Sequence, residues 1–248
     1  MQKRLIYVVF VAGALLGGGY YLYRTLRPSL GRSVRVVEWI RNPQAHPDWA
    51  VRAGTRCGAD TPFILPTDGF IGYLWDDSFR VGHRHQGIDI FGGSDVGLTP
   101  IVAAYPGYLT RLPDWKSSVI VRVPEDPLQP GRHRSCRERR HAGARRQIWL
   151  YYTHMAGPAG NSFISPDFPP GTYEKHVEAG TRLGYQGDYS GDPNNPVGVH
   201  LHFSIVLDDG QGNFRNELEI RNTLDPSPYL GLTLNARQSD RQLVVCGK

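Results

Sequence analysis

The chain has 248 residues, 40% of them hydrophobic, which is enough for one good-sized domain with a buried core. Its formal net charge of +5 comes from one short segment, because residues 131–146 hold seven arginines and one glutamate. Removing that +6 from +5 leaves −1 for the rest, so the basicity is local and a nucleic-acid partner is not expected.

The N-terminal run over residues 5–23 carries no charge, and basic residues flank it on both sides. At about 1.5 Å per residue, a helix of this length can span a bilayer. We therefore predict a transmembrane anchor within residues 1–30. A cleaved signal peptide is the alternative, because residues 12–14 resemble a small-residue cleavage site. Charge does not set the orientation, since both flanks are basic.

Turn residues divide the rest of the chain into short segments, with 29 glycines and 19 prolines in all. Residues 31–60 show no clear period, and we predict a linker or stalk there. Residues 61–208 alternate β-type runs with turns, which predicts a mainly antiparallel β domain. Residues 209–248 form a C-terminal extension. Expected strands lie within residues 99–112 (two, separated by a turn at Pro106 and Gly107), 117–123, 147–155, 198–206 and, weakly, 242–247.

The arginine-rich stretch lies inside an insertion, about residues 124–147, between two of these strands. A long hairpin insertion is therefore expected. Such a segment is often simply solvated. The more specific hypothesis is that this segment contacts an anionic envelope polymer or lipid headgroups. Near an anionic membrane surface, each basic residue contributes about 1 kcal/mol to binding.

The strand over residues 198–206, GVHLHFSIV, places two histidines one residue apart. Side chains alternate between the faces of a strand. One face therefore carries Leu201 and Phe203 toward a core, while the other carries His200 and His202. An isolated H-x-H pair is more often incidental. A functional role for His200 and His202 therefore requires further candidate residues elsewhere in the chain.

Further candidate ligands lie upstream. His85 and Asp89 are four residues apart around Gly87, in a stretch that does not favour a helix, and His154 ends another strand. Each is a weak signal alone. Together, two imidazoles and a carboxylate suit a zinc ion with a fourth position open for water, which is typical of a catalytic site.

Five segments, in order, resemble motifs of the lysostaphin/LytM-type family of zinc endopeptidases that cut peptidoglycan peptides. They are HQGIDI (85–90), GLTPIVAAYPGYL (97–109), YYTHM (151–155), VEAGTRLGYQGDYSG (177–191) and GVHLHFSI (198–205). The resemblance covers about residues 62–206; the long basic insertion and the tail after residue 206 depart from it. It implies a small antiparallel β-sheet domain of the lysostaphin-like, duplicated-hybrid-motif type, with a substrate groove across one sheet.

By this resemblance, His85, Asp89 and His202 bind one zinc ion per chain, and His154 and His200 form a non-ligand catalytic pair. One of the pair accepts the proton of the attacking water and the other stabilises the oxyanion; which does which stays open. The implied activity is hydrolysis of peptidoglycan stem peptides or cross-bridges, D,D-peptide or glycine bridge. A non-catalytic wall-binding module or activator of other hydrolases is the alternative.

The implied location is the bacterial cell envelope, membrane-anchored with the domain outside the cytoplasm, or secreted if the N-terminus is cleaved. His83 is an alternative ligand by spacing, but only His85 sets the H-x-G-x-D frame. The histidines outside every motif are predicted to be surface residues: His46, His133, His141 and His176.

There are three cysteines and no C-x-x-C pair, so a cysteine zinc site is not expected. Outside the cytoplasm one disulfide can form. Cys57 and Cys246 flank the predicted domain, and we predict that they are bonded, with Cys136 left free.

Overall fold

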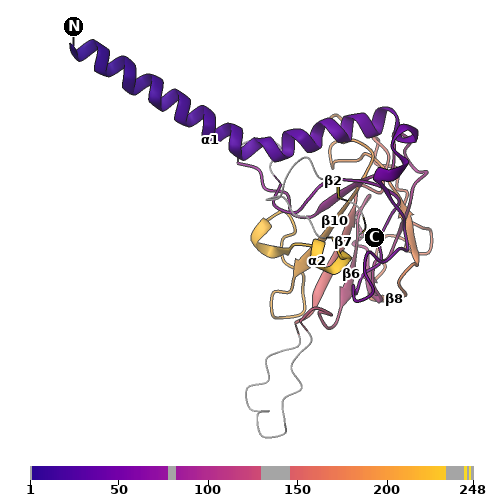
Figure 1. The fold of residues 1–248 in the computed structure, drawn as a ribbon. Coiled ribbons are helices and arrows are strands. Elements are labelled where there is room, and N and C mark those ends of the chain that lie inside the picture. Colours follow the sequence, from indigo (N-terminus) through magenta and orange to yellow (C-terminus); the bar gives the residue numbers. More distant parts are fainter. Residues whose placement is uncertain (1, 78–81, 130–145, 233–242, 245, 247–248) are drawn as a thin grey trace, which may run out of the picture.

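An antiparallel β-sheet forms the body of the protein (Figure 1). The computed structural model describes residues 2–77, 82–129, 146–232, 243–244 and 246, and within the first helix it leaves out the side chains of residues 2–12 and 24–31. Among the described residues, one sheet has nine strands in the order β1-β2-β3-β10-β7-β6-β5-β8, with β11 beside β10, and a second sheet pairs β4 with β9. The predicted mainly antiparallel β architecture is confirmed.

The strands are β1 (Ala50–Val51), β2 (Gly69–Tyr73), β3 (Ile88–Phe91), β4 (Pro100–Val102), β5 (Gly107–Thr110), β6 (Val119–Val123), β7 (Ile148–Thr153), β8 (Lys175–Val177), β9 (Arg182–Tyr185), β10 (Leu201–Leu207) and β11 (Thr223–Leu224). The helices are α1 (Gln2–Arg41), η1 (Pro43–Ala45), η2 (Pro47–Trp49), η4 (Ile220–Asn222) and α2 (Ser227–Leu230).

Strand β10 lies between β3 and β7, and its core face follows the predicted alternation. Leu201, Phe203 and Ile205 are fully buried in the main hydrophobic cluster. Burial of such side chains contributes about 1.5–3 kcal/mol each, which holds β10 in this orientation. The opposite face of the strand is therefore turned away from the core.

The strands predicted within residues 99–112 are present as β4 and β5, but they belong to different sheets. The strands flanking the basic insertion pair with each other, Val123 opposite Ile148. The predicted hairpin is confirmed at its base, while residues 130–145 lie outside the described residues. The weak strand predicted over residues 242–247 is not seen at Leu243, Val244 or Cys246, which are the residues of that stretch that the structure describes.

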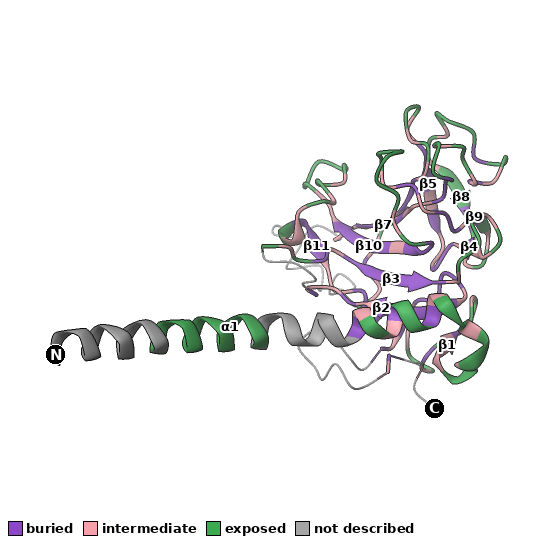
Figure 2. Ribbon diagram, turned by 90° about the horizontal axis from the view of Figure 1, so that it is seen from above, coloured by how far each residue is buried: buried purple, intermediate pink, exposed green. Residues whose placement is uncertain are grey.

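Helix α1 extends away from the body at its N-terminal end, and residues 13–23 are exposed there (Figures 1 and 2). No helix in the described part of the chain is long and apolar enough to cross a membrane. The transmembrane anchor predicted within residues 1–30 thus finds no support, and the side chains of its residues 5–12 lie outside the described set.

The C-terminal end of α1 lies along β2 and β3 (Figure 2). Val36 and Trp39 pack with Phe70 and Phe91 in a second hydrophobic cluster, and Trp39 Nε1–H donates a hydrogen bond to the Phe91 carbonyl at 2.7 Å. The stretch predicted as a linker therefore includes a helical segment with a buried face.

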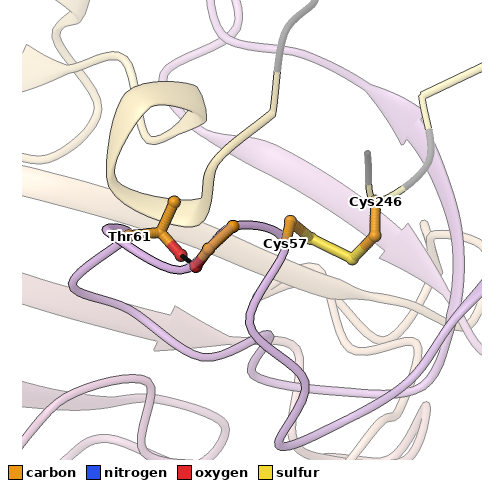
Figure 3. The surroundings of a disulfide bond; sticks show 4 residues. Cys57, Thr61 and Cys246 are labelled. Carbon is orange, nitrogen blue, oxygen red and sulfur yellow. Dashed lines mark hydrogen bonds between the residues drawn. A yellow bond between two sulfur atoms is a disulfide. The ribbon is translucent and has the colours of Figure 1, made fainter. Parts of the chain in front are cut away.

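A disulfide joins Cys57 to Cys246 across 189 residues, with their Cα atoms 4.5 Å apart (Figure 3). The predicted pairing is confirmed. Beside it, the Thr61 hydroxyl donates a hydrogen bond to the Gly58 carbonyl at 2.7 Å, closing the turn that follows Cys57. Cys136 lies outside the described residues.

Candidate metal centre

Neighbouring strands bring four of the five predicted site residues to one face of the sheet. His202 on β10 is paired in register with Asp89 on β3 and, on its other side, with Thr153 on β7. His154 lies just beyond the end of β7, and its ring centroid is 4.5 Å from that of His200. His200 precedes His202 by two positions and so shares its face.

His85 reaches this face from the irregular segment that precedes β3. Two residues later, Gly87 passes close against β10. A Cβ at Gly87 would lie 2.2 Å from the Phe203 carbonyl oxygen, so a side chain cannot be accommodated without a backbone shift. The glycine of the H-x-G-x-D frame thus permits the close approach that sets His85 beside Asp89.

Three donor atoms form a nearly equilateral triangle. His85 Nε2 lies 3.0 Å from Asp89 Oδ1 and 3.0 Å from His202 Nδ1, and the last two atoms are 2.9 Å apart. Zinc bonds of about 2.0–2.1 Å at tetrahedral angles would place such atoms about 3.3 Å apart. His85 and Asp89 are buried, at 3% and 6% exposure. The triangle is therefore slightly smaller than three ligand atoms around one zinc ion would be.

The ring nitrogens of His85 and His202 that point away from the triangle also make hydrogen bonds, as expected for histidines at a metal site. His85 Nδ1–H donates to the Leu74 carbonyl at 3.0 Å, and His202 Nε2 shares a hydrogen bond with Ser204 Oγ at 2.8 Å. When each neutral ring carries its proton on the outer nitrogen, the inner nitrogens are unprotonated, and two lone pairs and a carboxylate oxygen face one another. A cation satisfies this arrangement, and second bonds of this kind orient histidine ligands in metal sites.

Electrostatics shift the three donor groups in different directions. Burial alone would lower the pKa of His85, but the Asp89 carboxylate outweighs burial and raises that pKa. Burial alone would raise the pKa of Asp89, but the neighbouring His85, His200 and His202 hold that pKa well below its usual range. Burial lowers the pKa of His202 despite the nearby carboxylate. Asp89 is therefore ionised and His202 neutral near pH 7, as ligation requires.

His154 stands beside the triangle in an uncommon backbone conformation, with φ at +69°. Its Nδ1–H donates to the Tyr189 carbonyl at 2.7 Å, which leaves Nε2 as the available nitrogen. Burial first, and then the neighbouring His200 and His202, lower the pKa of His154 to about 3. A left-handed non-glycine residue costs about 1–3 kcal/mol and is often found at functional sites.

His200 is buried and lies between His154 and the donor triangle. Its Nδ1–H donates to the Gly198 carbonyl at 2.5 Å, and its Nε2 lies 3.5 Å from Asp89 Oδ1. The ring stacks on Phe91 at 4.9 Å between centroids and stands 4.5 Å from the His154 ring. In both imidazoles outside the triangle, Nδ1 is thus bonded to a backbone carbonyl, and Nε2 is the other ring nitrogen.

The site opens into a groove of about 530 Å³. Apolar side chains from α1, β3 and the loop before β10 line one part of it: Val36, Ile40, Phe91 and Val197. Polar groups from the motif segment, β7 and the C-terminal extension line another: Gln86, Tyr151 and Glu217. The groove therefore has both an apolar and a polar part of its lining.

The remaining histidines stand apart from the donor triangle. The His83 ring centroid is 6.5 Å from that of His85, and His83 lines the groove without joining the three donor atoms. His46 stacks on Trp49, and His176 is exposed on β8. His133 and His141 lie outside the described residues.

Sequence reasoning missed several residues that line the groove. Val36 and Ile40 are four apart on α1, which is a helical spacing, but no local pattern connected that helix to the site. Tyr73 ends β2 beside the groove, and Glu217 comes from the extension after β10. Neither position carries a motif that could have indicated it.

No protein-family model matches the chain, and no curated protein does. Solved structures do. The catalytic domain of lysostaphin from Staphylococcus simulans is 17% identical with a TM-score of 0.38, over 66% of this chain and 90% of that domain. Helicobacter pylori Csd3 is 17% identical with a TM-score of 0.38, over 69% of this chain and only 35% of that chain.

A putative glycyl-glycine endopeptidase LytM from Ruminococcus gnavus is 20% identical with a TM-score of 0.35, over 65% of this chain and 49% of that chain. The chain therefore spans about a third to a half of Csd3 and of this protein. By their names, the solved structures to which this chain is similar include peptidases of the lysostaphin and LytM type.

Proposed function

We propose that this chain is a zinc-dependent endopeptidase of the lysostaphin/LytM type that hydrolyses peptide bonds in peptidoglycan. The observation that supports this most strongly is the triangle of His85 Nε2, Asp89 Oδ1 and His202 Nδ1, with separations of 2.9–3.0 Å, in the lining of a groove. The five motifs that resemble the lysostaphin/LytM-type family indicate the substrate class, peptidoglycan peptides. We assign one zinc ion to these three side chains.

A zinc ion held there would supply a Lewis acid and lower the pKa of a water molecule to about 7. The protein's own groups then handle the proton. His200 Nε2, 3.5 Å from Asp89 Oδ1, lies beside the ligand triangle and accepts the proton of the attacking water. The protonated ring can return that proton to the leaving amine. Such a positioned acid–base group contributes about 10²–10⁴-fold.

His154 has a different role in this proposal. With its Nδ1–H bonded to Tyr189, the neutral ring offers only a lone pair at Nε2, and its pKa of about 3 disfavours a second proton. In this state it orients the water or a substrate N–H as an acceptor. It can donate to an oxyanion only once it is protonated, so oxyanion stabilisation requires proton transfer to His154 first.

We place the activity outside the cytoplasm, where peptidoglycan lies. The Cys57–Cys246 disulfide supports this location, because disulfides persist in oxidising compartments and are rare in the cytosol. The proposal is compatible with a bacterial envelope protein and with a secreted one.

The test is digestion of purified peptidoglycan followed by mass spectrometry of the released fragments. We expect new amino and carboxyl termini in the peptide part, loss of cleavage with a chelator, and recovery with one equivalent of zinc. Binding to peptidoglycan without any new termini, at full zinc occupancy, would instead establish a non-catalytic wall-binding module or an activator.

A further inference from the structure

Helix α1 contacts the segment that follows β2 through two polar side chains. Arg32 forms a buried ion pair with Asp77, with Nε 3.2 Å from Oδ2, and the two side chains are only 3% and 1% exposed. Ser33 shares a 2.7 Å hydrogen bond with the Tyr73 hydroxyl. The helix therefore holds both ends of the short stretch from Tyr73 to Asp77.

Asp77 in turn closes a tight turn around Leu74. Its Oδ2 accepts a 2.6 Å hydrogen bond from the Leu74 N–H, and its own N–H donates to the Leu74 carbonyl at 3.1 Å. Its carbonyl accepts the His85 N–H at 2.9 Å. One aspartate thus fixes the backbone of Leu74 and that of His85 in the same turn.

The Leu74 carbonyl is the acceptor that orients the His85 ring. It takes the Nδ1–H at 3.0 Å, while Nε2 of the same ring lies 3.0 Å from Asp89 Oδ1. A continuous set of hydrogen bonds therefore runs from Arg32 through Asp77 and Leu74 to a predicted metal ligand. All of these groups are buried.

We infer that Arg32, acting through Asp77, is a positioning residue for the metal centre, so that the C-terminal part of α1 completes the site. Arg32 keeps the Asp77 carboxylate in place, the carboxylate holds the Leu74 turn, and the Leu74 carbonyl sets the rotation of the His85 ring. The inference rests on the proposed function, because it takes His85 to be a zinc ligand. Substituting a residue that orients a metal ligand typically lowers metal affinity by about 10–100-fold.

Packing next to the ion pair supports this role. Val36 and Trp39 bury the same end of α1 against β2 and β3, so Arg32 is held over Asp77 rather than free to swing into solvent. Val36 and Ile40 also line the groove. The helix segment therefore contributes a groove wall as well as the support for a ligand.

The experiment measures the zinc affinity of the full chain by competition with a chromophoric chelator, in parallel with thermal melting of the metal-free protein. Arg32→Met and Asp77→Asn should each weaken zinc binding by about 10–100-fold. Arg32→Lys, which keeps the charge, should lose less. In the double variant the loss should match that of one single variant, because both changes cut the same path. Arg41→Met, exposed on the same helix, is the matched control and should bind zinc like the wild type.

A merely structural ion pair would lower the melting temperature and leave zinc affinity unchanged, and that result overturns the inference. An equal loss in Arg41→Met would overturn it as well. If Arg32→Met does not fold, Arg32→Lys and the double variant decide, since neither leaves a buried charge unpaired. A folded wild-type protein that binds no zinc would overturn the proposed function itself, which separates the two failures.

Discussion

His202 and Asp89 lie directly opposite each other on neighbouring antiparallel strands, with His202 Nδ1 2.9 Å from Asp89 Oδ1. Directly opposed residues have Cβ atoms about 4.5–5.5 Å apart, which suits two short side chains that share an ion. The sheet register itself thus builds two thirds of the proposed ligand set. His85 is added from the segment whose passage over β10 requires Gly87.

The two histidines of β10 should respond differently to substitution. His202→Ala should lose both zinc and hydrolysis, because two remaining ligands hold the ion poorly. His200→Ala should keep about one zinc ion per chain and lose hydrolysis by about 10²–10⁴-fold. Metal content by mass spectrometry and peptidoglycan cleavage should be measured on the same samples. Metal-free His200→Ala beside zinc-loaded His202→Ala would reverse the two roles.

Gly87→Ala should destabilise the junction of the motif segment with β10. The new Cβ would lie 2.2 Å from the Phe203 carbonyl oxygen, so one backbone must shift, at a cost of about 1–3 kcal/mol. Gly198→Ala is the matched control, because its Cβ would meet neighbours at ordinary distances of 3.6 Å. Denaturant unfolding of the metal-free proteins compares them. Equal stability of the two variants would contradict the close approach.

Acid should destabilise the metal-free protein through His154. Its pKa is about 3 in the folded protein and about 6.5 when unfolded, so between these values the unfolded chain binds more protons. The contribution of neutral His154 to the free energy of unfolding is fully present above pH about 6.5. It is lost as the pH falls toward 3, by up to about 1.4 kcal/mol per pH unit.

The measurement is urea unfolding at a series of pH values in the presence of a chelator. His154→Asn should flatten this part of the profile, and asparagine tolerates the left-handed backbone at that position. His176→Asn, on the exposed surface of β8, should keep the wild-type slope. A slope that persists unchanged without His154 would show that another group carries the acid sensitivity.

The disulfide should contribute to stability without taking part in metal binding. Replacing Cys57 and Cys246 by serine should lower the free energy of unfolding by about 2–5 kcal/mol, since the bond closes a loop across 189 residues. Zinc content should not change, because the bond does not contact the donor triangle. Reductant should destabilise the wild type and leave the serine variant unaffected. A variant as stable as the wild type would mean that the bond adds nothing to folding.

The sequence by itself determined the local pattern of the site. The period of two in residues 198–206 placed Leu201 and Phe203 in the core and His200 and His202 on the other face, because neighbouring strand side chains point in opposite directions. Gly87 and the isoleucines beside Asp89 likewise argued against a helix at His85 and Asp89, although their spacing of four would suit one. These are properties of a few consecutive residues, and no distant contact is needed to infer them.

Only the tertiary structure decided which distant groups meet. Pairing of β10 with β3 joins residues 113 positions apart in His202 and Asp89, and the ion pair between Arg32 and Asp77 brings α1 to the site across 45 positions. Nothing in the local sequence around Arg32 indicates an aspartate partner. Such contacts depend on strand order, register and helix docking, which are set by the burial of the whole core. For this reason the residues of the donor triangle could be proposed from local motifs, whereas the contact of α1 with Asp77 could not.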